Sequence, residues 1–131
     1  MSHYVYRTKR GLLRTVQATD GCAAWRLADL RHTVAEVHDL TGATWRYSAA
    51  IPGPHRDEGV YITPGQAQAL YLAACDYELS PAAREHLRAG CLWTPSERRA
   101  LHQRGLIVST GPRSPLTDIG RAFVARTEGG A

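Results

Sequence analysis

Hydrophobic and polar positions alternate along the first twenty residues of the chain. Residues 4–8 alternate and are rich in β-forming side chains, and residues 12–19 alternate again after Gly11. Because successive side chains of a strand point to opposite faces, two alternating runs around a glycine predict a β-hairpin with its turn near Gly11. Asp20-Gly21 is expected to end the second strand.

Between residues 23 and 40 the apolar positions change to helical spacing. They recur every three or four residues, at Leu27, Leu30, Val34 and Val37. Because residues at these intervals share one side of an α-helix, the pattern predicts an amphipathic helix over residues 23–40, with Gly42 as its stop.

Alternation returns after that glycine. Residues 44–49 and 60–62 predict two further strands, and the polar segment 52–59, rich in Pro and Gly, predicts the loop between them. The first 62 residues therefore predict a β-β-α-β-β unit. We interpret its aromatic residues first as core and sheet-face side chains, with a surface for a partner as the alternative. They are Tyr4, Tyr6, Trp45, Tyr47 and Tyr61.

Three helix starts follow. Each has Thr or Ser directly before Pro, at Thr63, Ser80 and Thr94, and Gln or Glu stands three residues after the first and the third. The hydroxyl caps free N–H groups, proline fits the first turn, and Glu or Gln completes a capping box. The third helix is expected to end at about Arg104, before Gly105. Two helices joined by a short turn containing a glycine have the layout of a helix-turn-helix.

The segment after this glycine predicts a β-hairpin. Residues 106–109 are a short apolar run typical of a strand, residues 110–114 form a turn, and residues 115–116 begin a return strand.

A last helix is expected from the cap at Thr117 through Arg126. Gly120 in its first turn indicates a close approach of two backbones. Its apolar anchors are Leu116, Ile119, Phe123 and Val124.

The order of these elements resembles the winged helix-turn-helix superfamily. Members commonly show Leu-x-x-(Arg/Lys)-Gly-Leu-Ile, then a wing, then Leu-Thr-x-x-Gly-Arg. This chain has the first motif at 101–107, the wing at 109–115 and the second motif at 116–121. The resemblance covers residues 63–126 and implies a winged helix-turn-helix domain at 63–131. With the β-β-α-β-β unit predicted at 1–62, an α+β chain is expected. An unrelated helical bundle with one hairpin is the alternative.

The resemblance implies a recognition helix at residues 94–104. Opposite Leu101, this helix carries four polar candidates for contact with DNA, namely Ser96, Arg99, His102 and Gln103. Arg and Gln can make bidentate contacts to guanine and adenine in the major groove. The alternative is an ordinary solvated helix face.

Further arginines are candidates for the DNA backbone. Arg113 at the tip of the wing could enter a minor groove or contact phosphate, or simply be solvated. Four arginines are candidates for phosphate contacts that position the protein, and any of them could instead pair with Glu85 or Glu97. They are Arg84, Arg88, Arg98 and Arg104.

Charge supports an anionic partner. The chain of 131 residues has a formal net charge of +4, and the whole excess falls in residues 79–131. Such an asymmetry suggests that the C-terminal part faces a polyanion. The sequence shows no segment of transmembrane or signal-peptide length, so a cytoplasmic protein is expected. The three cysteines, Cys22, Cys75 and Cys91, lack metal-ligand or disulfide spacing and are interpreted as small hydrophobes.

No catalytic constellation is found, so the sequence predicts a protein that is not an enzyme and needs no metal or cofactor. His55, Asp57 and Glu58 could bind metal or act as acid and base, but a polar loop explains them better. Cys91 with His86 resembles a nucleophile and base, yet nothing supplies an orienting third group.

The leading hypothesis is a small protein that binds double-stranded DNA, either a transcription regulator or an accessory factor of a mobile element. A single module of this size buries only about 600–1,000 Å² on DNA, so a homodimer is expected. Residues 1–62 are the candidate for its dimer contact or for partner binding. The alternative is a protein-interaction module, an inhibitor or assembly subunit, whose winged-helix surface docks an acidic protein.

Overall fold

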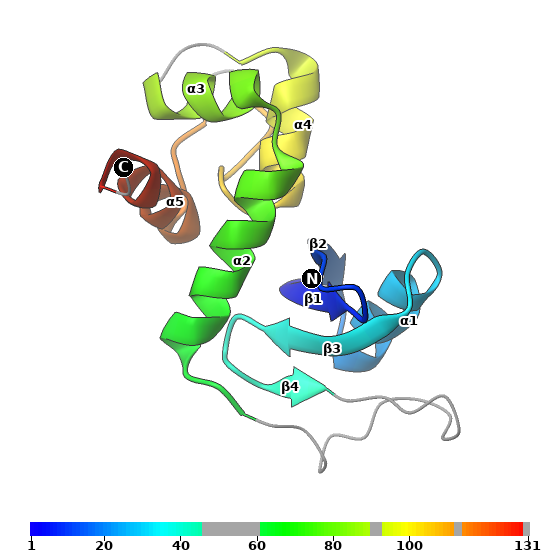
Figure 1. The fold of residues 1–131 in the computed structure, drawn as a ribbon. Coiled ribbons are helices and arrows are strands. Elements are labelled where there is room, and N and C mark those ends of the chain that lie inside the picture. Colours follow the sequence, from blue (N-terminus) through cyan, green and yellow to red (C-terminus); the bar gives the residue numbers. More distant parts are fainter. Residues whose placement is uncertain (46–60, 90–92, 112–113, 130–131) are drawn as a thin grey trace. The chain divides into compact units, whose positions relative to one another are not determined.

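The computed structural model describes residues 1–45, 61–89, 93–111 and 114–129 (Figure 1). Over these residues the chain is mixed α and β, with one four-stranded antiparallel sheet and five helices. It divides into two compact units, Met1–Cys75 and Asp76–Ala131, called here the N-terminal and the C-terminal unit. The division falls inside a helix and not at the boundary expected between residues 62 and 63.

The predicted hairpin at the start of the chain is confirmed. Strand β1 (Ser2–Thr8) pairs with β2 (Leu13–Ala18) in antiparallel register, with Tyr4 opposite Val16. The turn contains Gly11, whose φ of +88° lies in the region that favours glycine. β1 lies inside the sheet, which has the order β2-β1-β3-β4.

The predicted helix over residues 23–40 is wrong in its second half. Helix α1 (Gly21–Asp29) begins at Asp20, whose carboxylate accepts a hydrogen bond from the Ala23 amide at 2.8 Å. The chain then turns and returns as strand β3 (Val34–Asp39), which pairs antiparallel with β1. Leu27 and Leu30, expected on a buried helical stripe, are 45% and 81% exposed.

A β-bulge explains why the apolar residues of strand β3 have the spacing expected of a helix. The pairing of β1 with β3 shifts between Arg7, opposite Glu36, and Thr8, opposite Val34. An extra residue in one strand reverses the alternation at that point. Val34 and Val37 therefore both join one core cluster although they are three residues apart.

The remaining strand predictions are confirmed only in part. Strand β4 (Thr44–Trp45) pairs with β3 and begins the strand expected at 44–49, whose later residues lie outside the described part. Tyr61 and Ile62 are not in a strand; the Ile62 amide donates to the Gly42 carbonyl at 2.9 Å. The described residues do show the order β-β-α-β-β. Its fourth element, however, is β3, which was expected to be helical, and its fifth element is β4.

The core of the N-terminal unit lies between α1 and the sheet. Helix α1 lies beside the sheet (Figure 1). Its Trp25 is 1% exposed and packs with Tyr4, Tyr6 and Trp45 in one cluster. The core interpretation is thus confirmed for Tyr4, Tyr6 and Trp45, but it is wrong for Tyr61, which is 72% exposed. Tyr47 lies outside the described residues.

The helices after residue 62 begin directly after the capping residues predicted from the sequence. They are α2 (Pro64–Glu78), α3 (Pro81–Ala89), α4 (Pro95–Gln103) and α5 (Asp118–Gly129). Thr63 and Gln66 form a reciprocal capping box, with hydrogen bonds of 2.9 and 3.1 Å. Ser80 and Thr94 each accept a backbone N–H three residues on, and Gly105, at φ +70°, follows α4. Among the helices described, none combines the length and apolar character needed to cross a bilayer.

The two cysteines in the described residues agree with their interpretation as small hydrophobes. Cys75 is fully buried in α2, and Cys22 is half-buried beside the core under α1. Cys22 is a free thiol. Cys91 lies outside the described part of the chain.

In the described part of the predicted hairpin after α4, the strand pairing is a bridge between Ile107 and Leu116. The Val108 amide donates to the Pro115 carbonyl at 3.0 Å. The Ser109 amide donates to the Ser114 side chain at 2.7 Å, so a hydroxyl replaces a backbone partner there. Proline has no N–H to extend the ladder, which limits the pairing of this segment.

The close approach predicted at Gly120 is confirmed. A Cβ added at this glycine would lie 2.0 Å from the Leu106 carbonyl oxygen. Thr117 holds both sides of the contact, because its hydroxyl donates to the Gly105 carbonyl and accepts from the Gly120 amide at 3.0 Å. Phe123, one turn later in α5, is 1% exposed.

Replacing Gly120 with alanine should destabilise the C-terminal unit by about 3 kcal/mol, because the methyl group overlaps a backbone atom that cannot rotate away. The matched control is Gly111→Ala, whose added Cβ would meet only the Ser109 hydroxyl at 3.5 Å. Urea denaturation followed by circular dichroism measures both changes. Equal stability of the two variants would contradict the backbone contact.

Candidate nucleic-acid interface

Helices α3 and α4 form the framework of the candidate interface. Leu87 of α3 and Leu101 of α4 are buried, at 3% and 0% exposure. His86 Nδ1 and Glu97 Oε2 lie 2.7 Å apart and tie the two helices together. Apolar burial and this polar contact together fix the rotation of α4 about its axis.

The carboxylate of Glu97 is stabilised in its charged form. Burial alone would raise its pKa, but hydrogen bonds from His86 and from the side chain and backbone of Thr94 outweigh burial and lower the pKa below its ordinary value. Glu97 therefore serves two helices, as the third residue of the α4 capping box and as the partner of α3.

The four candidates on α4 share its exposed face. Ser96, Arg99, His102 and Gln103 are all exposed, opposite the fully buried Leu101. Within the residues that the structure describes, no carboxylate forms an ion pair with Arg99. This face therefore presents a cation, an amide, an imidazole and a hydroxyl to solvent.

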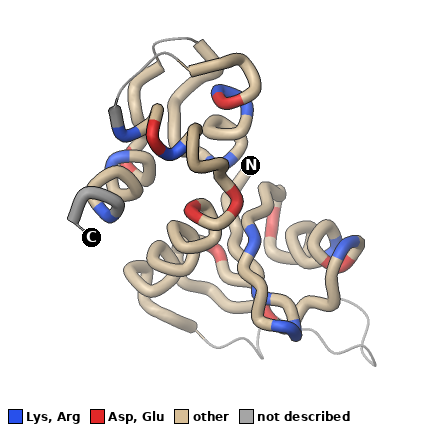
Figure 2. The backbone as a smooth tube through the Cα atoms, turned by 45° about the horizontal axis from the view of Figure 1, so that its top comes forward, with Lys and Arg blue, Asp and Glu red and all other residues tan. Residues whose placement is uncertain are grey.

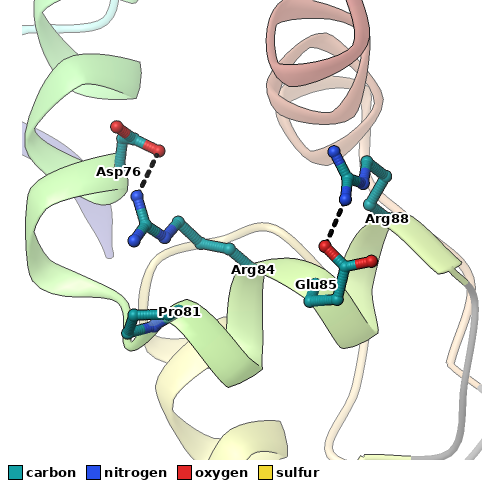
Figure 3. Close-up of a pocket in the computed structure, with 5 residues that line it drawn as sticks. All are labelled: Asp76, Pro81, Arg84, Glu85 and Arg88. Carbon is teal, nitrogen blue, oxygen red and sulfur yellow. Dashed lines mark hydrogen bonds and ion pairs between the residues drawn. The ribbon is translucent and has the colours of Figure 1, made fainter.

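Arg84 and Arg88, predicted to contact phosphate, are paired with carboxylates. Arg84 Nη1 lies 3.1 Å from Asp76 Oδ1, and Arg88 pairs with Glu85 within α3 (Figure 3). Together with Pro81 they line a pocket of about 310 Å³. Because each guanidinium faces a carboxylate, this pocket has mixed charge and does not favour an anion.

The other arginine candidates are also held by the protein or lie outside the described part. Arg104 donates to Glu78 at 3.0 Å and to the Ala100 carbonyl at 2.8 Å, and its side chain is 19% exposed. Arg98 donates to the Trp93 carbonyl at 3.2 Å. Arg113 falls outside the described residues, so its place in the wing stays a prediction.

The charge asymmetry seen in the sequence depends on where the chain is divided. The C-terminal unit includes Asp76 and Glu78, so it carries eight arginines and six carboxylates, a net charge of +2. The N-terminal unit has the same net charge of +2. Basic and acidic positions follow each other along the helices rather than forming one uniformly basic stretch (Figure 2).

A second polar cluster lies in the sheet and is structural. His38 is 5% exposed, and its Nδ1 lies 2.8 Å from the Thr44 hydroxyl across the β3–β4 pair. Burial lowers the pKa of His38, although the nearby carboxylate of Glu36 opposes this. Glu36 itself pairs with Arg7 at 2.6 Å. These contacts link three neighbouring strands.

Sequence reasoning missed the acidic partners on α2. Asp76 and Glu78 lie at the end of that helix. Asp76 pairs with Arg84 eight residues later in the chain, and Glu78 pairs with Arg104 26 residues later. No local signal predicts such pairs. Glu85 and Arg88, in contrast, have the three-residue spacing that brings side chains together on a helix, so the sequence offers this pair as an alternative to phosphate contact.

Metal chemistry has no candidate in the described part. There, no group of three or more His, Cys, Asp or Glu residues gathers closely enough to hold an ion. His55, Asp57 and Glu58 lie outside the described residues.

Replacing Glu97 with glutamine should destabilise the C-terminal unit by about 1 kcal/mol at pH 6–7, because the amide keeps a capping acceptor but loses the charge facing His86. Since the folded-state pKa of Glu97 is lowered, this stability is present above the unfolded pKa and is lost as the pH falls through the folded value. Urea titrations at several pH values should show the difference shrinking below about pH 4.5.

The control for this variant is Glu85→Gln. The Glu85 side chain is 60% exposed, so its loss should cost at most about 0.5 kcal/mol at any pH. A pH-independent effect of Glu97→Gln would count against the stabilised carboxylate.

Comparisons of the chain with protein-family models, with curated proteins and with solved structures found no match. The function must therefore be inferred from the residues, the packing and the charges of the chain itself.

Proposed function

We propose that this chain binds double-stranded DNA with the exposed face of α4 in the major groove, as a winged helix-turn-helix protein. The observation that carries the proposal is the rotation of α4. Leu101 points into the core, and the opposite face presents Arg99 and Gln103, the side chains best suited to reading guanine and adenine edges. Ser96 and His102 on the same face can donate to bases or phosphates.

The elements around α4 agree with the proposed fold. A short helix precedes it, Gly105 ends it, the Ile107–Leu116 bridge follows, and α5 packs against the backbone after it. In this proposal the segment 109–115 is the wing, and Arg113 at its tip contacts the DNA backbone or minor groove.

The ion pairs change the expected roles of the other arginines. Arg84, Arg88 and Arg104 already face carboxylates, so contact with phosphate would first have to break or share those pairs. We therefore assign base contact and most of the affinity to the α4 face. The salt dependence should be modest, because the slope of log affinity against log salt is about −0.9 per neutralised phosphate.

A small contact area favours a dimer on paired half-sites, and the N-terminal unit remains the candidate for that contact. We propose the role of a transcription regulator or of an accessory factor of a mobile element. The alternative from the sequence is a module without enzymatic activity that docks an acidic protein. The same ion pairs do not favour it over DNA, because a paired arginine is less available to carboxylates as well as to phosphates.

Replacing Arg99 with alanine should weaken binding to a preferred duplex by about tenfold to a hundredfold and should relax the preference for one base pair. The duplex is obtained by selection from a random library with the full chain, and affinities are measured by fluorescence anisotropy. The matched control is Arg126→Ala on α5, an exposed arginine in the same unit. It should change affinity by less than about threefold and leave base preference intact.

Two results would contradict the proposal. One is the absence of any duplex complex below about 10 μM protein at low salt, where non-specific complexes of basic binders already form. The other is an equal effect of Arg99→Ala and Arg126→Ala on all duplexes.

A further inference from the structure

The N-terminal unit has a groove at the end of the sheet where the β1–β2 turn meets the segment after α1. Two adjoining concavities of about 430 and 480 Å³ share Lys9, Arg31, His32 and Thr33. Leu30 lines the first and Leu12 the second. We call this feature the hairpin-end groove. Its volumes fall in the range of pockets that hold side chains or small ligands.

Backbone and ring contacts hold the two walls of the groove together. The Lys9 amide donates to the Thr33 carbonyl at 2.9 Å, which joins the β1–β2 turn to the segment before β3. The ring of His32 lies against Tyr6 of the core, with centroids 6.0 Å apart. Because both walls are anchored, the groove is preformed, which lowers the entropic cost of binding.

Three cations line the hairpin-end groove. Lys9, Arg10 and Arg31 are all exposed, and in the described ranges none of them forms an ion pair with a carboxylate. This differs from the C-terminal unit, where Arg84 and Arg104 are each paired. Asp29 is the acid on the rim, beside Leu30.

Exposed leucines flank these cations. Leu30 is 81% exposed and Leu12 is 38% exposed, one in each concavity, and Leu27 on α1 is 45% exposed. Leucines placed beside cations in a groove suit a partner that brings both apolar and acidic side chains. A continuous phosphate backbone suits the groove less well, because it would leave the leucines without apolar contact.

We propose that the hairpin-end groove binds an acidic peptide segment of another protein, with carboxylates against Lys9, Arg10 and Arg31 and with apolar side chains against Leu12 and Leu30. The inference goes beyond DNA binding and does not depend on it, since it uses only the N-terminal unit. It gives that unit the role of recruiting a protein partner.

The test uses the full chain, labelled with ¹⁵N, and a small panel of synthetic peptides. Each peptide has an acidic core of Asp and Glu between two leucines, with the leucines two to five residues apart and glycines at both ends. At least one peptide should bind with a Kd below about 100 μM at low salt. The amide signals that shift should be those of residues 8–12 and 29–34.

Two control peptides separate the contributions. One keeps the acidic core and replaces both leucines with glycine, and the other keeps the leucines and replaces the acids with Asn and Gln. Each should bind at least about fivefold more weakly than the parent peptide. An oligothymidine of matched charge, which offers phosphates without leucines, should bind more weakly than the parent peptide as well.

Variants of the protein complete the test. Lys9→Glu combined with Arg31→Glu should weaken the parent peptide at least about tenfold, and Leu30→Ser about fivefold. All three side chains are exposed, so the fold should survive, and the amide spectrum checks this. The matched control, Arg126→Glu in the C-terminal unit, should bind as the unchanged chain does.

Four outcomes would overturn the proposal. They are no saturable binding of any peptide up to about 1 mM, shifts confined to residues outside the groove, unchanged binding by the charge-reversed variant, and equal or tighter binding of the glycine peptide or of oligothymidine. Because the readout uses peptides and the N-terminal unit, failure here leaves the DNA proposal standing, and failure to bind DNA leaves this one standing.

Discussion

The C-terminal unit depends on one contact between two backbones, in which the Leu106 carbonyl approaches Gly120 so closely that no Cβ fits between them. Leu106 lies three residues after the end of α4 at Gln103, and Gly120 lies in the first turn of α5. The contact therefore fixes the end of α4 against the start of α5, and Thr117 reinforces it from both sides. It holds the C-terminal end of α4 in place, while the buried Leu101 and the contact between His86 and Glu97 fix the rotation of the helix about its axis.

Charge placement matters more in this protein than net charge. Most of the described arginines around α3 and α4 donate to carboxylates or carbonyls of the same unit, and these contacts hold helices together. What remains available to a partner is set by geometry: Arg99 and Gln103 on α4, and Lys9, Arg10 and Arg31 around the hairpin-end groove. A protein with one face for DNA and another for an acidic partner could link the two.

Sequence reasoning succeeded where local chemistry decides the structure. The three caps, the turn at Gly11 and the close approach at Gly120 each follow from what one residue type can do with its backbone or hydroxyl. The polar face of α4 was predictable for the same reason, because helical spacing alone places Arg99 and Gln103 opposite Leu101.

It failed where partners distant in sequence decide. The bulge opposite Arg7 and Thr8 gave β3 the apolar spacing of a helix, and only the pairing with β1 reveals it. The carboxylates of Asp76 and Glu78 reach arginines on other helices, which no local pattern indicates. The groove was equally hidden, since it joins a turn near residue 9 to a segment near residue 31.

The most direct test of the central claim is the side-chain spectrum of the arginines, recorded as Nε–Hε signals of the ¹⁵N-labelled chain with and without a selected duplex. The account predicts that the Arg99 signal shifts on binding, while the signals of Arg84 and Arg104 stay in place because their carboxylate partners remain. A shift of Arg84 and Arg104 with an unchanged Arg99 signal would contradict it.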